Sequence, residues 1–386
     1  MSESALGSAR PMAVYKNLLP GDPAPWFNAR ASTRGEFAFD TVGGRYVVLC
    51  LFGSAAHRRS AEALRAAFAA QDVFNDETAC FFGVSFDPAD VAEGRVAGRL
   101  PGYRFFWDFD GAISRLYGAI PRDGRPDQGP VRLRQQWVVL DPTLRVLKTL
   151  PFADDSADGD EVVRFLRGLP QPSQFAGFEV QAPVLVLPNA FTAEFCTRLI
   201  ALYEAHGGAE TGFMRDVDGR TLHLQDHRHK RRRDHVITDI EVIAEARAQI
   251  VRRVLPEVLK AYQYNATRME RYIVSCYRAE DGAHFVAHRD NTTKGTAHRR
   301  FAISVNLNAD FDGGELSFPE FGPKGFKPAP GGAVVFSCSL LHAVSKVTRG
   351  CRYAFLPFLY DDKAAKIREA NDAFLGENGG GYRARH

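Results

Sequence analysis

The chain has 386 residues, of which 45% are hydrophobic and 25% charged, with a formal net charge of +3. This length exceeds that of a typical single domain, so we expect two domains. The small net charge gives no reason to expect nucleic acid as a partner. No run approaches the roughly 18 apolar residues of a membrane span, and the first residues lack the apolar core of a signal peptide. The six scattered cysteines are typical of buried thiols in a reducing compartment, so we expect a cytoplasmic protein without a membrane partner.

After an N-terminal extension at residues 1–16, residues 17–169 alternate apolar runs with helical segments. The continuous apolar runs are typical of strands buried on both faces. The expected elements are a strand at Tyr46–Gly53, a helix at His57–Phe74, a strand at Cys80–Asp87, a short helix at Ile113–Tyr117, two strands turning at Asp141-Pro142, and a helix at Gly159–Leu169. This alternation predicts a three-layer α/β sandwich.

Three motifs of this first half are GDPAPWF at Gly21–Phe27, VVLCLFG at Val47–Gly53 and VVLDP at Val138–Pro142. Through them the first half resembles the peroxiredoxin branch of the thioredoxin fold. In that family the loop after the central strand carries a reactive Cys, with a Glu three residues later. Glu62 is present here, but Arg59 occupies the position of the thiol.

Peroxide reduction needs a thiolate nucleophile, which a guanidinium cannot replace. Cys50 and Cys80 lie inside predicted strands and are poorly placed to attack peroxide. We therefore expect a non-catalytic domain that serves as a scaffold, a docking surface or the contact of a homodimer, and a thiol peroxidase is the alternative. The cluster His57-Arg58-Arg59 at a helix start is either an anion site or a solvated helix end.

Residues 170–182 are rich in Pro, Gly and Gln and predict a linker, followed by a second domain at 183–365 and a Gly-rich tail at 366–386. The second domain opens with a short strand and a helix capped by Thr192. A helix over Glu241–Tyr262, interrupted by Pro256, precedes a series of short strands that continues to about residue 361. This order predicts an α+β domain, a jelly roll (double-stranded β-helix) with supporting helices.

A polar, basic segment runs from Asp216 to His235 and holds four histidines, His223, His227, His229 and His235. Clustered histidines suit a metal, and basic runs suit nucleic acid. The sequence equally fits a solvated loop beside an active site, and a specific version is a loop that meets an acidic or peptide substrate. We expect a loop here and leave its role open.

His288 and Asp290 form a His-x-Asp pair on a predicted strand, where side chains two residues apart share a face. His342 on a later strand completes a set of two His and one carboxylate. This set binds Fe(II) on one face and leaves open positions for substrates. The three residues are therefore the predicted metal ligands and catalytic centre.

The ordered motifs of residues 277–352 resemble the prolyl 4-hydroxylase-type branch of the 2-oxoglutarate/Fe(II) dioxygenases. The matching residues are Tyr277, Gly282, His288-Arg289-Asp290, Asn306-Leu307-Asn308, Gly313-Gly314-Glu315-Leu316, His342 and Arg352. The resemblance implies Fe(II), 2-oxoglutarate and O₂ as cofactor and cosubstrates, with ascorbate as a reductant. It also implies a cosubstrate pocket at Tyr277, Arg352 and Asn306, where Arg352 binds the far carboxylate of 2-oxoglutarate and Tyr277 adds a hydrogen bond.

The implied reaction is hydroxylation of an unactivated carbon with release of succinate and CO₂. The resemblance suggests a prolyl residue of a peptide or protein, but small molecules use the same barrel. The chain departs from the family at Phe285, where relatives carry a Tyr, and at Asn306, usually aromatic or aliphatic. Arg289 and Arg300 are expected to flank the mouth and either orient an anionic substrate or be solvated. The alternative from another class is a sensor that binds metal or 2-oxoglutarate without turnover.

Overall fold

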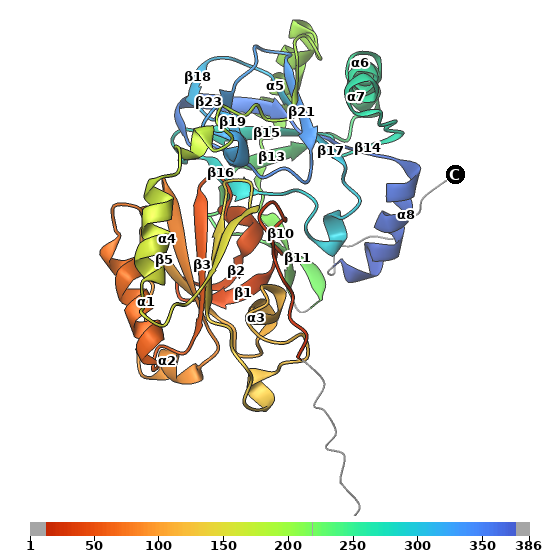
Figure 1. The fold of residues 1–386 in the computed structure, drawn as a ribbon. Helices are drawn as coiled ribbons and strands as arrows, with labels where there is room; N and C mark the ends of the chain where they lie inside the picture. Colours follow the sequence, from red (N-terminus) through yellow and green to blue (C-terminus); the bar gives the residue numbers. More distant parts are fainter. Residues whose placement is uncertain (1–12, 218, 376–386) are drawn as a thin grey trace, which may run out of the picture. The chain divides into compact units, whose positions relative to one another are not determined.

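A computed structural model describes residues 13–217 and 219–375 (Figure 1). The chain divides into two compact units, and the division follows Val180, within the predicted linker. The first unit comprises the residues up to Val180 together with Glu320–Gly322, and the second comprises the remainder. Each unit has its own sheet and core, as the two-domain prediction requires.

The first unit is built on a seven-stranded mixed sheet in the order β2-β1-β5-β4-β3-β6-β7. The central strands β3, β4 and β5 are parallel, and the outer pairs are antiparallel. The strands are β1 (Asn28–Ala31), β2 (Arg34–Ala38), β3 (Tyr46–Gly53), β4 (Ala79–Ser85), β5 (Tyr103–Trp107), β6 (Gln136–Leu140) and β7 (Val146–Pro151). All residues of β3 and β4 are buried, which explains why these strands are continuous apolar runs in the sequence.

Both faces of this sheet are covered. One core cluster joins α1 and α4 to one face, and a second joins α3 and the segment Phe39–Val42 to the other. The helices are α1 (Arg58–Ala69), α2 (Pro88–Ala92), α3 (Ala112–Leu116) and α4 (Asp158–Arg167). The three-layer α/β prediction is confirmed. The β1–β2 hairpin was not predicted, because its two short strands lack an apolar run.

The described residues of the second unit form two larger antiparallel sheets, as expected of a jelly roll, and a separate two-stranded sheet, β10–β11. The large sheet follows the order β14-β24-β17-β23-β15-β13-β9, with β21 between β17 and β8 and with β18 beside β23. The smaller sheet follows the order β12-β16-β22-β19-β20. The strands are β8 (Leu185–Leu187), β9 (Ala209–Glu210), β10 (Phe213–Val217), β11 (Arg220–Leu224), β12 (Lys230–Arg231), β13 (Arg233–Val236), β14 (Arg268–Glu270), β15 (Ile273–Arg278), β16 (His284–His288), β17 (Phe301–Asn306), β18 (Phe311–Gly313), β19 (Leu316–Ser317), β20 (Gly325–Phe326), β21 (Ala333–Ser337), β22 (His342–Val344), β23 (Val347–Phe355) and β24 (Phe358–Tyr360).

Three helices cover one face of the large sheet and share a core with it. The Thr192 side chain caps the first of them by accepting a hydrogen bond from the Phe195 backbone, as predicted. The predicted long helix is broken at Val254, two residues before Pro256, because proline cannot continue the hydrogen-bond ladder. The helices of this unit are α5 (Ala193–His206), α6 (Ile240–Arg253), α7 (Leu255–Tyr262) and α8 (Asp362–Asn371). The predicted tail at 366 begins inside α8, and its stretch from Glu377 lies outside the described residues.

The basic segment at 216–235 is not the loop that the sequence suggested. It forms part of the β10–β11 hairpin and the strands β12 and β13, which pair with β16 and β15. The loop prediction was wrong because charged side chains were expected to be exposed to solvent. Lys230, Arg232 and Asp234 are instead buried.

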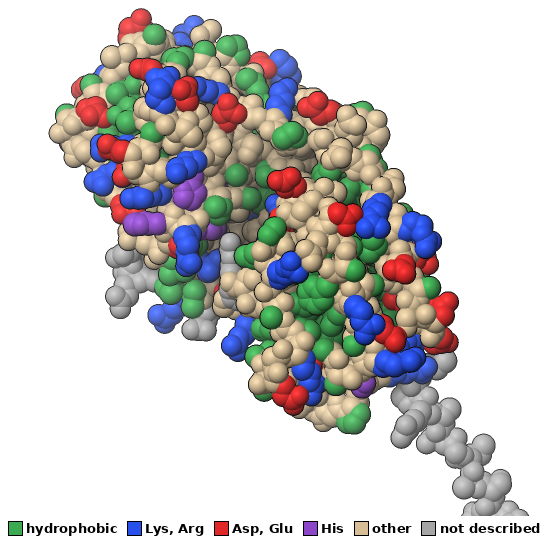
Figure 2. Space-filling view, turned by 90° about the vertical axis from the view of Figure 1, so that its left-hand side faces the viewer, with side chains coloured by type: hydrophobic (Ala, Val, Ile, Leu, Met, Phe, Trp, Pro, Cys, Tyr) green, Lys and Arg blue, Asp and Glu red, His purple; other side chains and the backbone are tan. Residues whose placement is uncertain are grey.

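No helix of the described residues is long and apolar enough to span a membrane. On the face shown in Figure 2, Lys and Arg side chains are interspersed with Asp and Glu. On that face, the small positive net charge is therefore not gathered into one basic patch.

Candidate metal centre and cosubstrate pocket

The predicted ligands His288, Asp290 and His342 come together in the second unit. His288 is the last residue of β16 and pairs with His342, the first residue of β22. Asp290 lies beyond the end of β16, so the expectation that the pair shares a strand face was wrong in detail. A hydrogen bond of 2.9 Å from the Asp290 backbone N–H to the Cys338 carbonyl holds the turn that directs the Asp290 carboxylate toward the two histidines.

The donor atoms of these three residues face one another. The Nε2 atom of His342 lies 3.3 Å from one Asp290 oxygen, and the Nε2 atom of His288 lies 3.7 Å from the other. All three donor atoms lie within 4.8 Å of one another. Two donors at about 2.1 Å from one ion and at a right angle are separated by about 3.0 Å, so the spacing suits a single metal ion.

Backbone contacts orient both imidazole rings. The Nδ1 atom of His288 lies 2.8 Å from the Val286 carbonyl, and that of His342 lies 3.0 Å from the Leu340 carbonyl. Because a carbonyl only accepts, each Nδ1 carries the proton and each Nε2 keeps its lone pair for a metal. Among the described residues, no other group of three His, Cys, Asp or Glu side chains is spaced to share an ion.

The protonation states suit metal binding. Burial lowers the pKa of His288 well below its ordinary value, and the nearby His342 adds to this effect. Burial alone raises the pKa of Asp290, but His342 and His288 outweigh it and lower the pKa. A neutral imidazole and a carboxylate are the ligand forms. The residues thus fit Fe(II), which two His and one carboxylate hold on one face.

The strands of the large sheet explain how buried polar side chains gather on one of its faces. Side chains alternate between faces along a strand. Val274 and Cys276 of β15 join the helix-covered core, whereas Ser275 and Tyr277 face the other way. The same alternation holds in the neighbouring strands, whose residues on this polar face are Ser304, Asn306, Arg352 and Ala354. One sheet therefore serves an apolar core and a polar pocket.

Arg352 is buried on this polar face with polar but uncharged neighbours. Its Nε donates to Asn306 Oδ1 at 3.1 Å, and its NH2 donates to Ser304 Oγ at 2.9 Å. The Asn306 amide donates in turn to the Pro328 carbonyl. Among the described residues, no carboxylate lies within ion-pair distance of Arg352. A buried guanidinium without a carboxylate is a site for an anion.

Tyr277 lies between two guanidinium groups. Its ring centroid is 5.4 Å from the Cζ atom of Arg352 and 5.6 Å from that of Arg232. The NH1 group of Arg232 donates to the Tyr277 hydroxyl at 3.2 Å. Because arginine only donates, the hydroxyl oxygen accepts here and its own proton is available to a ligand. The structure thus brings Tyr277, Arg352 and Asn306 together, as the sequence predicted.

Sequence reasoning missed the buried charges of the basic segment. Arg232 donates to Asp234 at 2.7 Å, and Asp234 also accepts from Ser275. The signal that was available is the alternation Lys230-x-Arg232-x-Asp234, which places three charges on one face of a strand. Burial lowers the pKa of Lys230 to about 6, and the positive charge of Arg232 adds to this shift.

The four histidines of this segment do not form a metal site. His223 accepts a hydrogen bond from the Gly212 backbone, and His227 lies against Glu210. The ring of His229 packs on Phe213, and that of His235 packs on His206. Each histidine therefore contacts a different neighbour.

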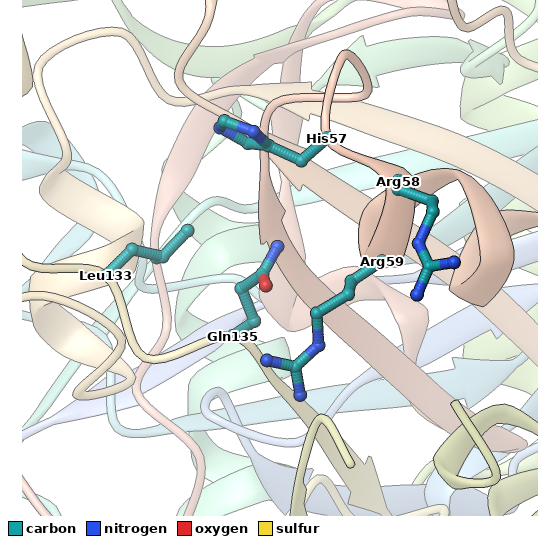
Figure 3. Close-up of a pocket in the computed structure, with 5 residues that line it drawn as sticks. All are labelled: His57, Arg58, Arg59, Leu133 and Gln135. Carbon is teal, nitrogen blue, oxygen red and sulfur yellow. The ribbon is translucent and has the colours of Figure 1, made fainter. Parts of the chain in front are cut away.

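In the first unit, the cluster at the start of α1 lines a pocket of about 380 Å³ (Figure 3). The lining residues are His57, Arg58, Arg59, Leu133 and Gln135. Arg59, which replaces the expected thiol, donates to the Phe152 carbonyl at 2.7 Å and lies 3.4 Å from the exposed Asp154. The pocket lining contains no thiol.

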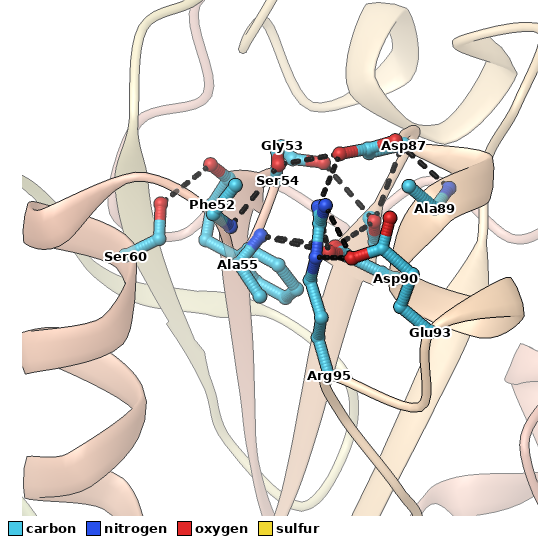
Figure 4. Close-up of polar contacts among 12 residues, drawn as sticks. Phe52, Gly53, Ser54, Ala55, Ser60, Asp87, Ala89, Asp90, Glu93 and Arg95 are labelled. Atoms are coloured by element: carbon cyan, nitrogen blue, oxygen red, sulfur yellow. Dashed lines mark hydrogen bonds and ion pairs between the residues drawn. The ribbon is translucent and has the colours of Figure 1, made fainter.

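A network of ionic hydrogen bonds holds the loop after β3 (Figure 4). Ser54 donates to Asp87 at 2.6 Å, and the Ala55 backbone donates to Asp90 at 2.9 Å. Arg95 reaches Asp87 at 3.0 Å and Asp90 at 3.3 Å. Each charge in this network has an opposite charge within reach, so the loop is fixed by the segment that follows β4.

The thiols near this loop are not available as nucleophiles. Cys50 and Cys80 are buried in β3 and β4. Burial raises the pKa of Cys50 well above its ordinary value and that of Cys80 to about 12. A thiol without thiolate character does not attack peroxide.

Residues 272–360 match the 2OG-Fe(II) oxygenase superfamily. Over 89 residues the chain is 33% identical to a PKHD-type hydroxylase of Synechococcus sp. strain JA-2-3B'a(2-13), and this match covers 21% of the chain and 39% of that relative. The chain thus spans well under half the length of this relative.

Two solved structures are similar to separate parts of the chain. A prolyl hydroxylase from Trichoplax adhaerens, in complex with a hypoxia inducible factor peptide, has 17% identity and a TM-score of 0.37, covering 47% of this chain and 85% of its own. Peroxidoxin BcpB from Mycobacterium tuberculosis has 21% identity and a TM-score of 0.32, covering 40% and 100%. The family match contains His288, Asp290, His342 and Arg352. Residues 272–360 therefore belong to a 2OG-Fe(II) oxygenase domain, the family that the sequence predicted for this part of the chain.

Proposed function

We propose that the protein is an Fe(II)- and 2-oxoglutarate-dependent dioxygenase that hydroxylates an unactivated carbon. The observation that carries this proposal is the set of converging donor atoms of His288, Asp290 and His342, in the same unit as a buried arginine without a carboxylate partner. His288, Asp290 and His342 would hold the iron, which would supply O₂ activation coupled to decarboxylation of 2-oxoglutarate to succinate and CO₂. Ascorbate would serve as the external reductant.

Different residues of the site have different roles in binding 2-oxoglutarate. Arg352 binds the far carboxylate through a charge-assisted pair. Tyr277 donates its free hydroxyl proton to the same cosubstrate. Asn306 positions Arg352, because both polar groups of its side chain are engaged by Arg352 and the Pro328 carbonyl. The apolar ring of Phe285 lies 3.5 Å from that of His288 and shields this ligand from water.

We further propose a prolyl residue in a peptide or protein as the substrate. The support is the likeness to PKHD-type and prolyl hydroxylases over the domain that carries the ligands. The sensor alternative predicts binding of iron and 2-oxoglutarate without decarboxylation, so turnover distinguishes the two. The role of the first unit as a scaffold or dimer contact remains a prediction, as do the domain boundaries and the cytoplasmic location.

The test is formation of succinate from 2-oxoglutarate by the purified full-length chain, with and without Fe(II). We expect slow iron-dependent turnover even without a primary substrate, and stimulation by proline-containing peptides. His288→Ala should abolish both iron binding and turnover, with circular dichroism to confirm folding. Iron binding without succinate under all conditions would favour the sensor.

A further inference from the structure

The buried face of the segment Lys230–Asp234 carries only charges. Lys230, Arg232 and Asp234 are each about 5% exposed, and they alternate with more exposed residues. Charged residues are almost never buried unless they are paired. The hydrogen-bond and ion-pair partners of these three side chains therefore indicate the role of this face.

The Asp234 carboxylate is the shared partner of three basic side chains. Asp234 lies 2.7 Å from Arg232 and 3.6 Å from Arg271. Lys230 reaches it through Thr211, whose hydroxyl accepts from the Lys230 ammonium at 2.9 Å and donates to Asp234 at 2.7 Å. We call Lys230, Arg232 and Arg271 the cation cluster. It carries two more ionisable cationic groups than carboxylates.

Without a further anion, the excess positive charge destabilises the folded chain, because burial removes the water that would otherwise solvate it. The Nε group of Arg232 is buried and has no hydrogen-bond partner. Arg271 adopts a left-handed backbone conformation, with φ of +64°, that is uncommon for a residue with a side chain. Its side chain is 32% exposed, so the cluster is open to a ligand at this point.

The cluster lies beside the metal ligands. The Lys230 ammonium is 5.4 Å from the ring centroid of Phe285, and that ring stacks on His288 at 3.5 Å. The charge of Asp290 acts on both Lys230 and Arg271. Arg352 is a separate cation, on its own strand and bonded to Asn306 and Ser304. The pocket thus has two places for anions.

We propose that the cation cluster binds an anionic group, a carboxylate or a phosphate, of the primary substrate while Arg352 binds 2-oxoglutarate. This inference rests on the proposed function, since it assigns the second anion to the substrate of that reaction. An anion-orienting role for Arg289 and Arg300 stays a prediction. Both donate to backbone carbonyls of the chain, Arg289 to Ser339 and Arg300 to Ala297.

The first experiment measures binding of inorganic phosphate to the full-length protein loaded with Fe(II) and saturating 2-oxoglutarate, without O₂ and at constant ionic strength. With Arg352 occupied, we expect phosphate to bind and to raise the melting temperature. Lys230→Met and Arg271→Met should weaken this binding at least 10-fold. Arg252→Met, the same change at an exposed position of α6, should leave it unchanged. No phosphate binding, or equal binding by all variants, would overturn the inference.

The second experiment identifies the source of the anion by competition with bound phosphate. L-proline is compared with L-prolinamide, and an acetylated Glu-Pro-Gly amide with its Gln-Pro-Gly counterpart. Displacement by L-proline indicates the carboxylate of a free amino acid, and displacement by the glutamyl peptide indicates an acidic peptide. Amides that compete as well as the acids would contradict the inference. Uncoupled succinate formation tests the proposed function separately, because it needs neither phosphate nor the Lys230 and Arg271 side chains.

Discussion

The polar network of the first unit and the polar pocket of the second use the same residue types to opposite effect. Around the loop after β3, Asp87 and Asp90 are satisfied by Arg95, a serine and backbone N–H groups. In the second unit, Arg352 has only amide and hydroxyl partners, and three donor atoms converge on one point. Charges that satisfy one another fix a loop, whereas charges without a match indicate a ligand. The difference distinguishes a network that fixes a loop from a set of side chains that suits a ligand.

The comparison is tested most directly by removing one group from each unit. His342→Ala should lower iron-dependent succinate formation more than about 100-fold, because losing even an outer partner of a metal ligand costs about 10–100-fold. Arg59→Ala in the pocket of the first unit should change turnover less than about twofold. Succinate is measured for both variants at equal concentrations of folded protein. Equal losses would mean that the first unit takes part in the reaction.

The shared carboxylate of the cation cluster should matter more to folding than a carboxylate of the first unit. Asp234→Asn leaves the buried Arg232 without its carboxylate partner and should lower the free energy of unfolding by about 3–5 kcal/mol. Asp87→Asn, at a partly exposed site, should cost only about 1 kcal/mol. Urea denaturation measures both. A smaller loss for Asp234→Asn would show that the cluster does not depend on this carboxylate.

Arg352→Gln should separate cosubstrate binding from folding. It removes the cation expected to pair with the far carboxylate of 2-oxoglutarate, a loss of about 2–3 kcal/mol and thus a rise in KM of about 30- to 150-fold. Arg352→Lys should recover part of the affinity because it restores the charge but not the bidentate geometry. Initial rates of succinate formation against 2-oxoglutarate concentration give both values. A fall in kcat at unchanged KM would contradict the assigned role.

Much of this contrast could be predicted from the sequence. The buried strands β3 and β4 are continuous apolar runs, and the ligands His288, Asp290 and His342 follow from residue type and spacing. The alternation of Lys230, Arg232 and Asp234 places these charges on one face, but it does not indicate that this face is buried, because Lys230 and Arg232 also have partners that are distant in sequence. Arg232, for example, bonds Tyr277, 45 residues away. Local composition predicts solvation for such residues, and only the pairing of β12 with β16 places them inside.

The smallest effect expected is a pH dependence of stability that comes from Lys230. Its pKa is about 6 in the folded chain, lowered by burial and Arg232, and about 10.4 when unfolded. Between these values the unfolded chain binds a proton that the folded chain does not, so stability rises with pH, at most by about 1.4 kcal/mol per unit. The advantage of the wild type over Lys230→Met should therefore grow between pH 6.5 and pH 8.

Urea denaturation of both proteins at each pH measures this difference in the free energy of unfolding. The contributions of groups that titrate in the same way in both proteins, Asp234 and Asp290 among them, cancel when the two values are subtracted. A difference that stays flat would show that Lys230 keeps its proton in the folded chain. Saturating phosphate should itself flatten the slope, because an anion beside the ammonium favours the charged form. The same pair of proteins thus connects the excess charge of the pocket to the ligand that we expect it to bind.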